Sequence, residues 1–211
     1  FITTQDMTDD TLLRYVEAHL DTDTLVDMFA ARIFFNAKDW PENNIRVWRN
    51  KNPDDPSGMD TRWRFTLVDM DWGMSLLDTT TENYSFFFVA LSKNCVVSNI
   101  LRALMQNEGF RERVLVRFYR VFTEVYDTDR MLAELQAMYD ERKPLVELNA
   151  IRWPVYLKSE FTAEYWETEM KLLFTFVKDR QHLCLEQFYQ YFKLNDNIMQ
   201  EMIARVEGNP A

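Results

Sequence analysis

The chain has 211 residues, of which 47% are hydrophobic and 15% aromatic, and this length and composition are typical of one globular domain with a substantial core. Acidic residues outnumber basic ones by 34 to 24, which gives a formal net charge of −10. Such a charge repels phosphate backbones, so a nucleic-acid partner is not expected. Charged residues also interrupt every apolar stretch before it reaches the roughly 18 residues of a membrane span, and no span is expected.

The start of the chain is predicted to be helical. Apolar residues recur at intervals of three and four over residues 12–20 and again over residues 25–34, which is the spacing of two amphipathic helices. Asp21 and Asp23 lie where one of them would cap the second helix. We therefore expect two helices within the first 36 residues.

A loop and one hairpin are predicted next. Residues 36–44 contain one proline and two adjacent asparagines, which favour turns over helix. Residues 45–48 and 62–68 alternate with period two, and the run between them, residues 51–60, is rich in turn formers. The sequence therefore predicts a single β-hairpin over about residues 45–70 and little other sheet.

From Val96 to the end of the chain, the apolar residues have helical spacing. Gly109 separates two apolar helical segments, Asp127 is placed to cap a third, and Pro144 should kink or end it. A long apolar stripe at helical spacing runs from Trp166 to Cys184, and we interpret it as core packing. The predicted fold is mainly α, similar to the helical C-lobe of a kinase, with one small hairpin.

The two cysteines, Cys95 and Cys184, are too far apart in the sequence for a CxxC metal or redox motif. Each falls within an apolar helical pattern, where a free cysteine usually behaves as a small buried hydrophobic residue. We therefore expect two buried thiols, and they leave the cellular compartment open.

The loop at residues 36–44 carries the first candidate functional residues. Lys38, Asp39, Asn43 and Asn44 lie between a buried helix and a strand, and loops held by a rigid scaffold often carry active sites. Aspartate and asparagine also serve simply to satisfy the backbone of turns. This loop alone does not decide between the two interpretations.

Two aspartates at the end of the second strand form the next candidate group. Asp69 and Asp71 are two residues apart, so in an extended chain their side chains point to the same side. Two carboxylates held together repel each other unless a cation lies between them, and Mg²⁺ prefers oxygen ligands of this kind. In the alternative interpretation one aspartate caps the following turn and the other is solvated.

The order and spacing of these residues favour a function. In a protein kinase, a catalytic aspartate accepts the proton of the substrate hydroxyl, an asparagine five residues later binds metal, and an Asp-Phe-Gly aspartate binds Mg²⁺ beyond a short hairpin. Here Asp39 and Asn44 have the same spacing, and Asp71-Trp72-Gly73 follows the predicted hairpin.

The same segments resemble the CotH kinase family, a family of atypical protein kinases named after spore coat protein H. The resemblance rests on residues 36–44, Trp63-Arg64-Phe65 and residues 69–73, and it continues through residues 107–111, Arg152-Trp153 and residues 176–180. It covers roughly residues 20–192. The resemblance implies a kinase-like fold that binds ATP with Mg²⁺ or Mn²⁺ and phosphorylates hydroxyl groups of a protein substrate.

The resemblance also assigns roles to individual residues. Asp39 is then the catalytic aspartate, and Lys38 and Asn43 are candidates for contacts to the nucleotide. Asn44 and Asp71 are the metal ligands that the resemblance implies, with Asp69 as a further candidate ligand.

The N-terminal part of the sequence departs from the pattern of such a kinase. The chain has only four glycines, and they form neither a GxGxxG loop nor a P-loop. We expect the lobe that covers the nucleotide to lie upstream of Phe1. The chain would then be the catalytic C-terminal half of the enzyme, with little activity by itself. The substrate and the oligomeric state stay open. The compartment also stays open, and an extracytoplasmic or cell-surface location of the full-length protein is one alternative.

Two other functions are compatible with the residues. In the first, the chain is a catalytically inactive, kinase-like module that binds partners or serves a structural role. In the other, Asp69-Met70-Asp71 is the metal motif of a sugar-nucleotide glycosyltransferase. Those enzymes usually present this motif from a multi-stranded α/β sheet, so a single predicted hairpin argues against the last interpretation.

Overall fold

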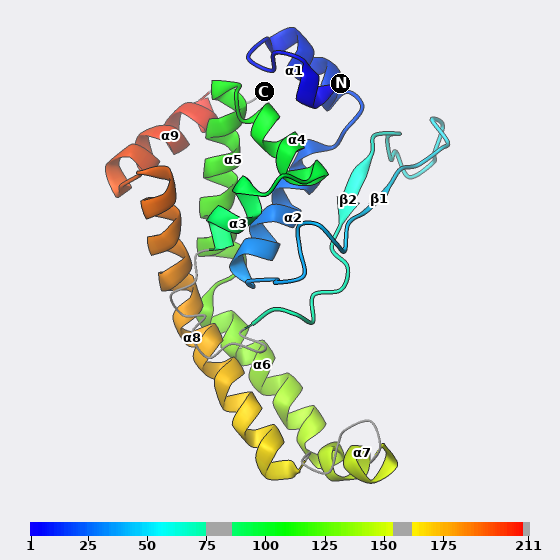
Figure 1. Cartoon of the computed structure of the whole chain (residues 1–211), viewed down its shortest axis with the longest axis vertical. Helices are drawn as coiled ribbons and strands as arrows, with labels where there is room; N and C mark the ends of the chain where they lie inside the picture. Colours follow the sequence, from blue (N-terminus) through cyan, green and yellow to red (C-terminus); the bar gives the residue numbers. More distant parts are fainter. Residues whose placement is uncertain (75–85, 154–161, 209–211) are drawn as a thin grey trace.

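The computed structural model describes residues 1–74, 86–153 and 162–208 (Figure 1). Helices account for 67% of the chain, and the only sheet among the described residues has two antiparallel strands. The predicted mainly α fold with one small hairpin is confirmed. The helices are α1 (Asp10–Glu17), α2 (Thr22–Phe34), α3 (Phe86–Ser92), α4 (Val96–Leu104), α5 (Glu108–Arg120), α6 (Thr128–Arg142), α7 (Val146–Arg152), α8 (Ala163–Phe192) and α9 (Asp196–Gly208).

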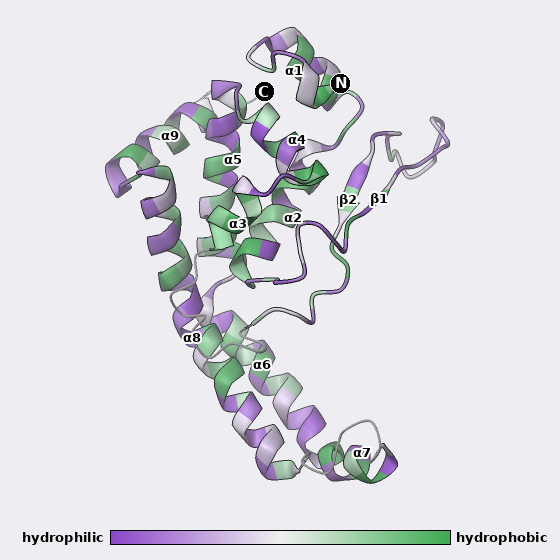
Figure 2. Cartoon of the chain, in the orientation of Figure 1, coloured by the Kyte–Doolittle hydropathy of each residue, from purple (hydrophilic) through white to green (hydrophobic). Residues whose placement is uncertain are grey.

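Helix α2 lies at the centre of the fold. Ten of its 13 residues are buried, because it packs against α3, α5, α8 and strand β2 (Arg64–Thr66). Figure 2 shows that α2 and α3 are largely apolar, as expected for helices that are covered on most sides. Rings from different helices meet beside α2, including Phe34, Phe87, Phe122 and Phe188. The second half of the C-terminal apolar stripe forms one wall of this core.

The stripe on α8 has two different environments. Its second half contains Cys184, which is buried in the main core, and Val177, which is buried beside residues of α6. Its first half leaves the body and packs against α6, a helix with no buried residue (Figure 1). In this two-helix arm, Trp166 stacks on Tyr139 with ring centroids 5.0 Å apart. Met170 is buried there, but Trp166 and Leu173 are only half-buried, so the expected core packing is only partial in the first half of the stripe.

The helices begin mostly as the sequence indicates, with one exception. Asp127 accepts a hydrogen bond from the backbone N–H of Arg130 and caps α6 as predicted. Asp21 precedes α2 but makes no side-chain cap. Its carboxylate lies instead 3.2 Å from Arg64 and 3.5 Å from Arg62, because the hairpin packs beside the start of α2. The predicted cap for α2 is thus an attachment point for the hairpin.

The hairpin pairs β1 (Arg46–Trp48) with β2, with Val47 opposite Phe65 (Figure 1). Strand β1 is exposed throughout, and Phe65 is the buried residue of the pair. The backbone N–H of Phe65 donates to Thr24 Oγ1 at 3.0 Å. Just before β2, Trp63 forms a parallel bridge with Leu20. The hairpin is therefore held to α2 by its second strand.

The two cysteines differ in burial. Cys184 is fully buried, as expected. Cys95 is half-buried and precedes α4 instead of lying within a helix, and its Sγ lies 3.2 Å from Ser98 Oγ. The prediction of a buried thiol is wrong for Cys95, because Cys95 precedes α4 and the buried face of that helix begins at Val97.

Among the described residues, no single helix is long and apolar enough to cross a membrane. Helices α3 and α4 reach that length and composition only together, as a pair bent by 90°.

Candidate functional site

The end of α2 fixes the start of the loop that carries Asp39. After Phe34 the chain turns at Asn36, which has a left-handed φ of 51°, a conformation that asparagine tolerates well. Arg180 of α8 is buried and donates to the carbonyls of Ile33 (2.8 Å) and Phe34 and to Asn36 Oδ1 (3.0 Å). A cation at a helix C-terminus also interacts favourably with the helix dipole. Arg180 therefore caps α2 and orients the first residue of the loop.

The segment around Asp71 is joined to the same loop by two backbone hydrogen bonds. The N–H of Lys38 donates to the carbonyl of Trp72 at 2.9 Å, and the N–H of Met74 donates to the carbonyl of Phe35 at 2.8 Å. Gly73 lies between these two hydrogen bonds and packs closely against the end of the first loop. A Cβ at Gly73 would lie 2.8 Å from the carbonyl oxygen of Phe35. Only glycine allows this contact, so the Asp-Trp-Gly segment needs its glycine for packing.

Asp39 and Asn44 are in direct contact. The amide Nδ2 of Asn44 donates a hydrogen bond to Asp39 Oδ2. The other carboxylate oxygen, Oδ1, is shielded from solvent and has no hydrogen-bond partner. Trp40, which follows Asp39, is buried against Phe29 of α2 and holds the loop on the core. The loop thus holds the Asp39 carboxylate in one orientation.

Asp69 and Asp71 lie near each other on the second loop. A hydrogen bond and the negative charge of Asp71 raise the pKa of the Asp69 carboxyl above its ordinary value, and the charge of Asp39 raises it further. Asp69 has a left-handed φ of 54°, so the chain is not simply extended through this pair. The structure therefore brings Asp39, Asn44, Asp69 and Asp71 into one neighbourhood, as the sequence led us to expect of the two loops.

A buried arginine that the sequence analysis did not single out lies beneath both loops. Arg32 of α2 is 0% exposed, and its guanidinium donates to the carbonyls of Asn44 (3.2 Å), Asp69 (3.0 Å) and Val68. Its Nη1 also lies 3.9 Å from Asp39 Oδ1. The available signal was a single cation within the apolar run of residues 28–34, since an arginine is rarely buried without partners.

The remaining candidate residues lie at the edge of this neighbourhood. Lys38 is half-buried, and Asn43 is exposed. An open polar hollow adjoins the site and is lined by Asn44, Ile45, Arg46, Val68 and Asp69. Within the described residues, no group of three or more His, Cys, Asp or Glu side chains is arranged to hold a metal ion. The assignments of Lys38 and Asn43 to the nucleotide and of Asn44, Asp69 and Asp71 to a metal stay predictions.

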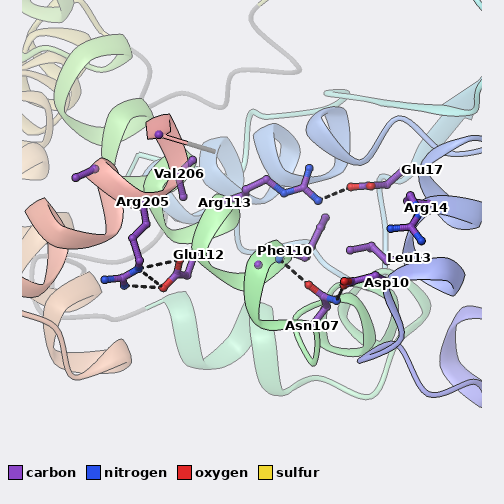
Figure 3. Close-up of a pocket in the computed structure, with 13 residues that line it drawn as sticks. Asp10, Leu13, Arg14, Glu17, Asn107, Phe110, Glu112, Arg113, Arg205 and Val206 are labelled. Atoms are coloured by element: carbon purple, nitrogen blue, oxygen red, sulfur yellow. Dashed lines mark hydrogen bonds and ion pairs between the residues drawn. The ribbon is translucent and has the colours of Figure 1, made fainter. Parts of the chain in front are cut away.

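A larger hollow, about 880 Å³, lies away from these loops between α1, α5 and α9 (Figure 3). Most of its charged side chains form ion pairs with one another. Arg205 pairs with Glu112 at 2.6 Å, and Arg113 pairs with Glu17 at 2.5 Å. These pairs attach α9 and α1 to α5, so the hollow is explained by helix packing, and the two loops stay the candidate site.

Comparison with known proteins gives a family match over most of the chain. The model of a family described as CotH kinase protein matches residues 1–184, a span that includes both loops, the hairpin and Arg180. No curated protein and no solved structure matches the chain.

Proposed function

This chain belongs to the CotH kinase protein family, and from that premise we propose that it forms the catalytic half of an ATP- and metal-dependent kinase acting on protein hydroxyls. The observation that carries the proposal is the fixed position of the Asp39 carboxylate. Asn44 donates a hydrogen bond to Asp39 Oδ2, five residues away in the sequence, and the charge of Asp39 acts on Asp69 of the second loop. A carboxylate held in one orientation beside a second acidic loop is the arrangement that a proton acceptor in phosphoryl transfer needs.

Asp39 is the proposed proton acceptor. In the reaction, the hydroxyl oxygen of the substrate forms a bond to the γ-phosphorus of ATP while the bond to the ADP oxygen breaks. The hydroxyl proton passes to the Asp39 carboxylate. The hydrogen bond from Asn44 keeps the carboxylate in one orientation, which matters because phosphoryl transfer depends mainly on positioning.

Asn44, Asp69 and Asp71 are the proposed ligands of Mg²⁺ or Mn²⁺. Their carboxylate and amide oxygens are the donors that these ions prefer, and Mg²⁺ commonly uses one or two carboxylates together with substrate phosphates. A set of this kind does not require three carboxylates arranged in advance. The repulsion that raises the pKa of Asp69 is the property that a bound cation would relieve. The ion would neutralise negative charge on the phosphates.

Lys38 and Asn43 are the proposed nucleotide contacts. They are the exposed or half-exposed polar residues of the same loop that flank Asp39 and Asn44. Asn43 is exposed, whereas Trp40 in the same loop is buried. The positive charge of Lys38 would neutralise negative charge on the phosphates.

The experiment is a phosphoryl-transfer assay with radiolabelled ATP on the full-length protein, with nucleotide binding measured by calorimetry. Asp71→Ala should abolish transfer, because it removes a metal ligand. Asp39→Asn should reduce transfer by about 10²-fold or more and leave nucleotide binding nearly unchanged, because general-base catalysis contributes that much to rate. The 211-residue chain alone should show little transfer, because its four glycines form no glycine-rich loop that would cover the phosphates.

Asp54→Asn is the matched control, because Asp54 is an exposed carboxylate in the turn of the hairpin. It should leave both transfer and binding unchanged. If the folded full-length protein binds no nucleotide in the presence of metal and transfers no phosphate, the kinase proposal fails and the binding-module interpretation replaces it.

A further inference from the structure

Arg32 occupies a position that ordinary packing does not explain. It is fully buried in α2 among apolar residues, and burial lowers its pKa, while the charges of Asp39 and Asp69 act in the opposite direction. Removing a guanidinium from water is costly, and an apolar residue of similar volume often gives an equal or more stable core. A buried arginine at this position therefore calls for a property that an apolar side chain lacks.

That property is the planar fork of the guanidinium. Arginine presents five N–H donors in a fixed geometry, and the two terminal nitrogens of Arg32 donate to two segments that are more than 20 residues apart. One set of bonds reaches the carbonyl of Asn44 in the first loop, and the other reaches Val68 and Asp69 in the second. The separation of these carbonyls is set by a rigid group.

The bonded carbonyls belong to residues at the reacting centre. Asn44 holds the Asp39 carboxylate, and Asp69 is two residues from Asp71. A change of about 1 Å in such a site can reduce a rate by about 10²-fold. The position of Arg32 therefore bears directly on whether the two loops act as one site.

We propose that Arg32 is a positioning residue that locks the loop of Asp39 and the loop of Asp71 into a single site. The structural part of this inference rests only on the observed hydrogen bonds, and its catalytic part rests on the proposed function. Arg32 does not touch the reacting atoms. It acts by fixing the backbone on which Asn44 and Asp69 are carried.

Arg180 is a matched control in the same molecule. It is also a buried arginine and also donates to backbone carbonyls, but its backbone bonds reach only Ile33 and Phe34 at the end of α2. Replacing either arginine by methionine should destabilise the protein, because both changes leave carbonyls without donors. Only the Arg32 change should release both loops.

The first measurement is hydrogen exchange of the 211-residue chain without metal. In Arg32→Met, amides in residues 42–48 and 66–72 should exchange about tenfold faster than in wild type, while α5 keeps its protection. In Arg180→Met, the increase should be confined to residues 33–38. Arg32→Lys retains a cation without the fork, and it should release the loops in part if Arg32→Met does not fold.

The second measurement is Mn²⁺ binding, followed by electron paramagnetic resonance. Loss of groups that orient metal ligands typically weakens binding by about 10–100-fold, and this is expected for Arg32→Met and Arg32→Lys, with a much smaller effect for Arg180→Met. Removing a nearby positive charge would by itself strengthen cation binding. Weaker binding therefore indicates positioning, and tighter binding would overturn it.

The outcomes separate this inference from the proposed function. If only one of the two loops loosens, or if both arginine variants give the same exchange pattern, Arg32 does not join the loops and the inference is wrong. If both loops loosen but wild type binds no Mn²⁺, the structural role of Arg32 is supported while the metal assignment of the proposed function is overturned.

Discussion

At the scale of single residues, the polar side chains of the site have a second, conformational reason to be there. Asn36, Asn44 and Asp69 all have φ values between 51° and 55°, in the left-handed region that asparagine and aspartate occupy more easily than most residues. The sequence pointed to Asn44 and Asp69 for metal binding. The structure shows that the same residues also shape the backbone, so a substitution at either position tests two properties at once.

Asn44 variants can separate these two properties. Asn44→Gly keeps the left-handed backbone and removes only the amide, whereas Asn44→Ala also places a Cβ in a conformation that costs about 1 kcal/mol. We expect Asn44→Gly to be the more stable variant by roughly that amount in urea unfolding, and both to lose Mn²⁺ binding. Equal stability of the two variants would show that the backbone conformation of Asn44 contributes nothing.

The two cysteines give a residue-scale prediction on pH. Burial raises the pKa of the Cys184 thiol from its ordinary value of 9.0 to about 11. Between these values the unfolded chain loses the proton that the folded chain keeps, so the free energy of unfolding should fall as pH rises from 9 toward 11. Urea unfolding at several pH values would measure this fall. Cys184→Ala removes the thiol, so the variant should be less stable through lost packing but should not show the fall in stability between pH 9 and 11.

Thiol labelling provides an independent check. In the native protein at pH 8, a thiol reagent should modify the half-exposed Cys95 and spare the fully buried Cys184. Cys184 should react only after urea unfolds the chain. Rapid labelling of both cysteines in the folded protein would contradict the packing of α8 against the core.

At the scale of secondary-structure elements, the hairpin depends on α2 for its position. A two-stranded hairpin is marginally stable by itself in water, and both residues of the first strand that flank Val47 are exposed. The contacts of Asp21 and Thr24 with the second strand attach it to the helix. Because residues 69–73 follow this strand directly, its attachment also places the second loop of the site.

Thr24→Val tests this attachment with almost no change in side-chain shape. It removes the acceptor of the Phe65 N–H, and a buried donor left unpaired costs about 1–3 kcal/mol. We expect a loss of stability in that range and faster hydrogen exchange at residues 63–68. Thr175→Val, on an exposed position of α8, is the control and should change stability by less than about 0.5 kcal/mol. Equal effects of the two variants would show that the bond to Phe65 is unimportant.

At the scale of the whole molecule, the described chain has a dense body and a thinner arm (Figure 1). The body is built around α2, whereas the arm consists of α6 and the first half of α8 and contains little buried surface. Regions with few buried apolar contacts open at lower free energy than the core. The arm should therefore be the less stable part of the molecule.

Hydrogen exchange should show this difference between arm and body. Amides of α6 should exchange faster than those of α2 and α5 under the same native conditions. Trp166→Ala removes the stack on Tyr139, which is worth about 0.5–1.5 kcal/mol beyond area burial, and it should reduce protection in α6 without affecting α2. Simultaneous loss of protection in both helices would mean that arm and body unfold as one unit.

The sequence by itself determined the features that depend on local pattern. The period of the apolar residues predicted the hairpin and most of the helices, though not α3, and Asp127 was placed correctly as a cap because capping depends on residues three apart. The spacing of Asp39, Asn44 and Asp71 led to the candidate loops and to the family, which the family model confirms. These features require no knowledge of distant contacts.

Only the tertiary structure decided which residues fix the two loops. Arg32 is a single cation within an apolar run, Arg180 lies in a helix that carries other charges, and most of their partners are carbonyl groups of the backbone, which every residue carries. Asp21 was expected to cap a helix and instead pairs with the hairpin, since its carboxylate meets Arg64 only after the chain has folded. Pattern identifies side chains that face a core, but it does not specify which distant backbone a buried guanidinium will meet.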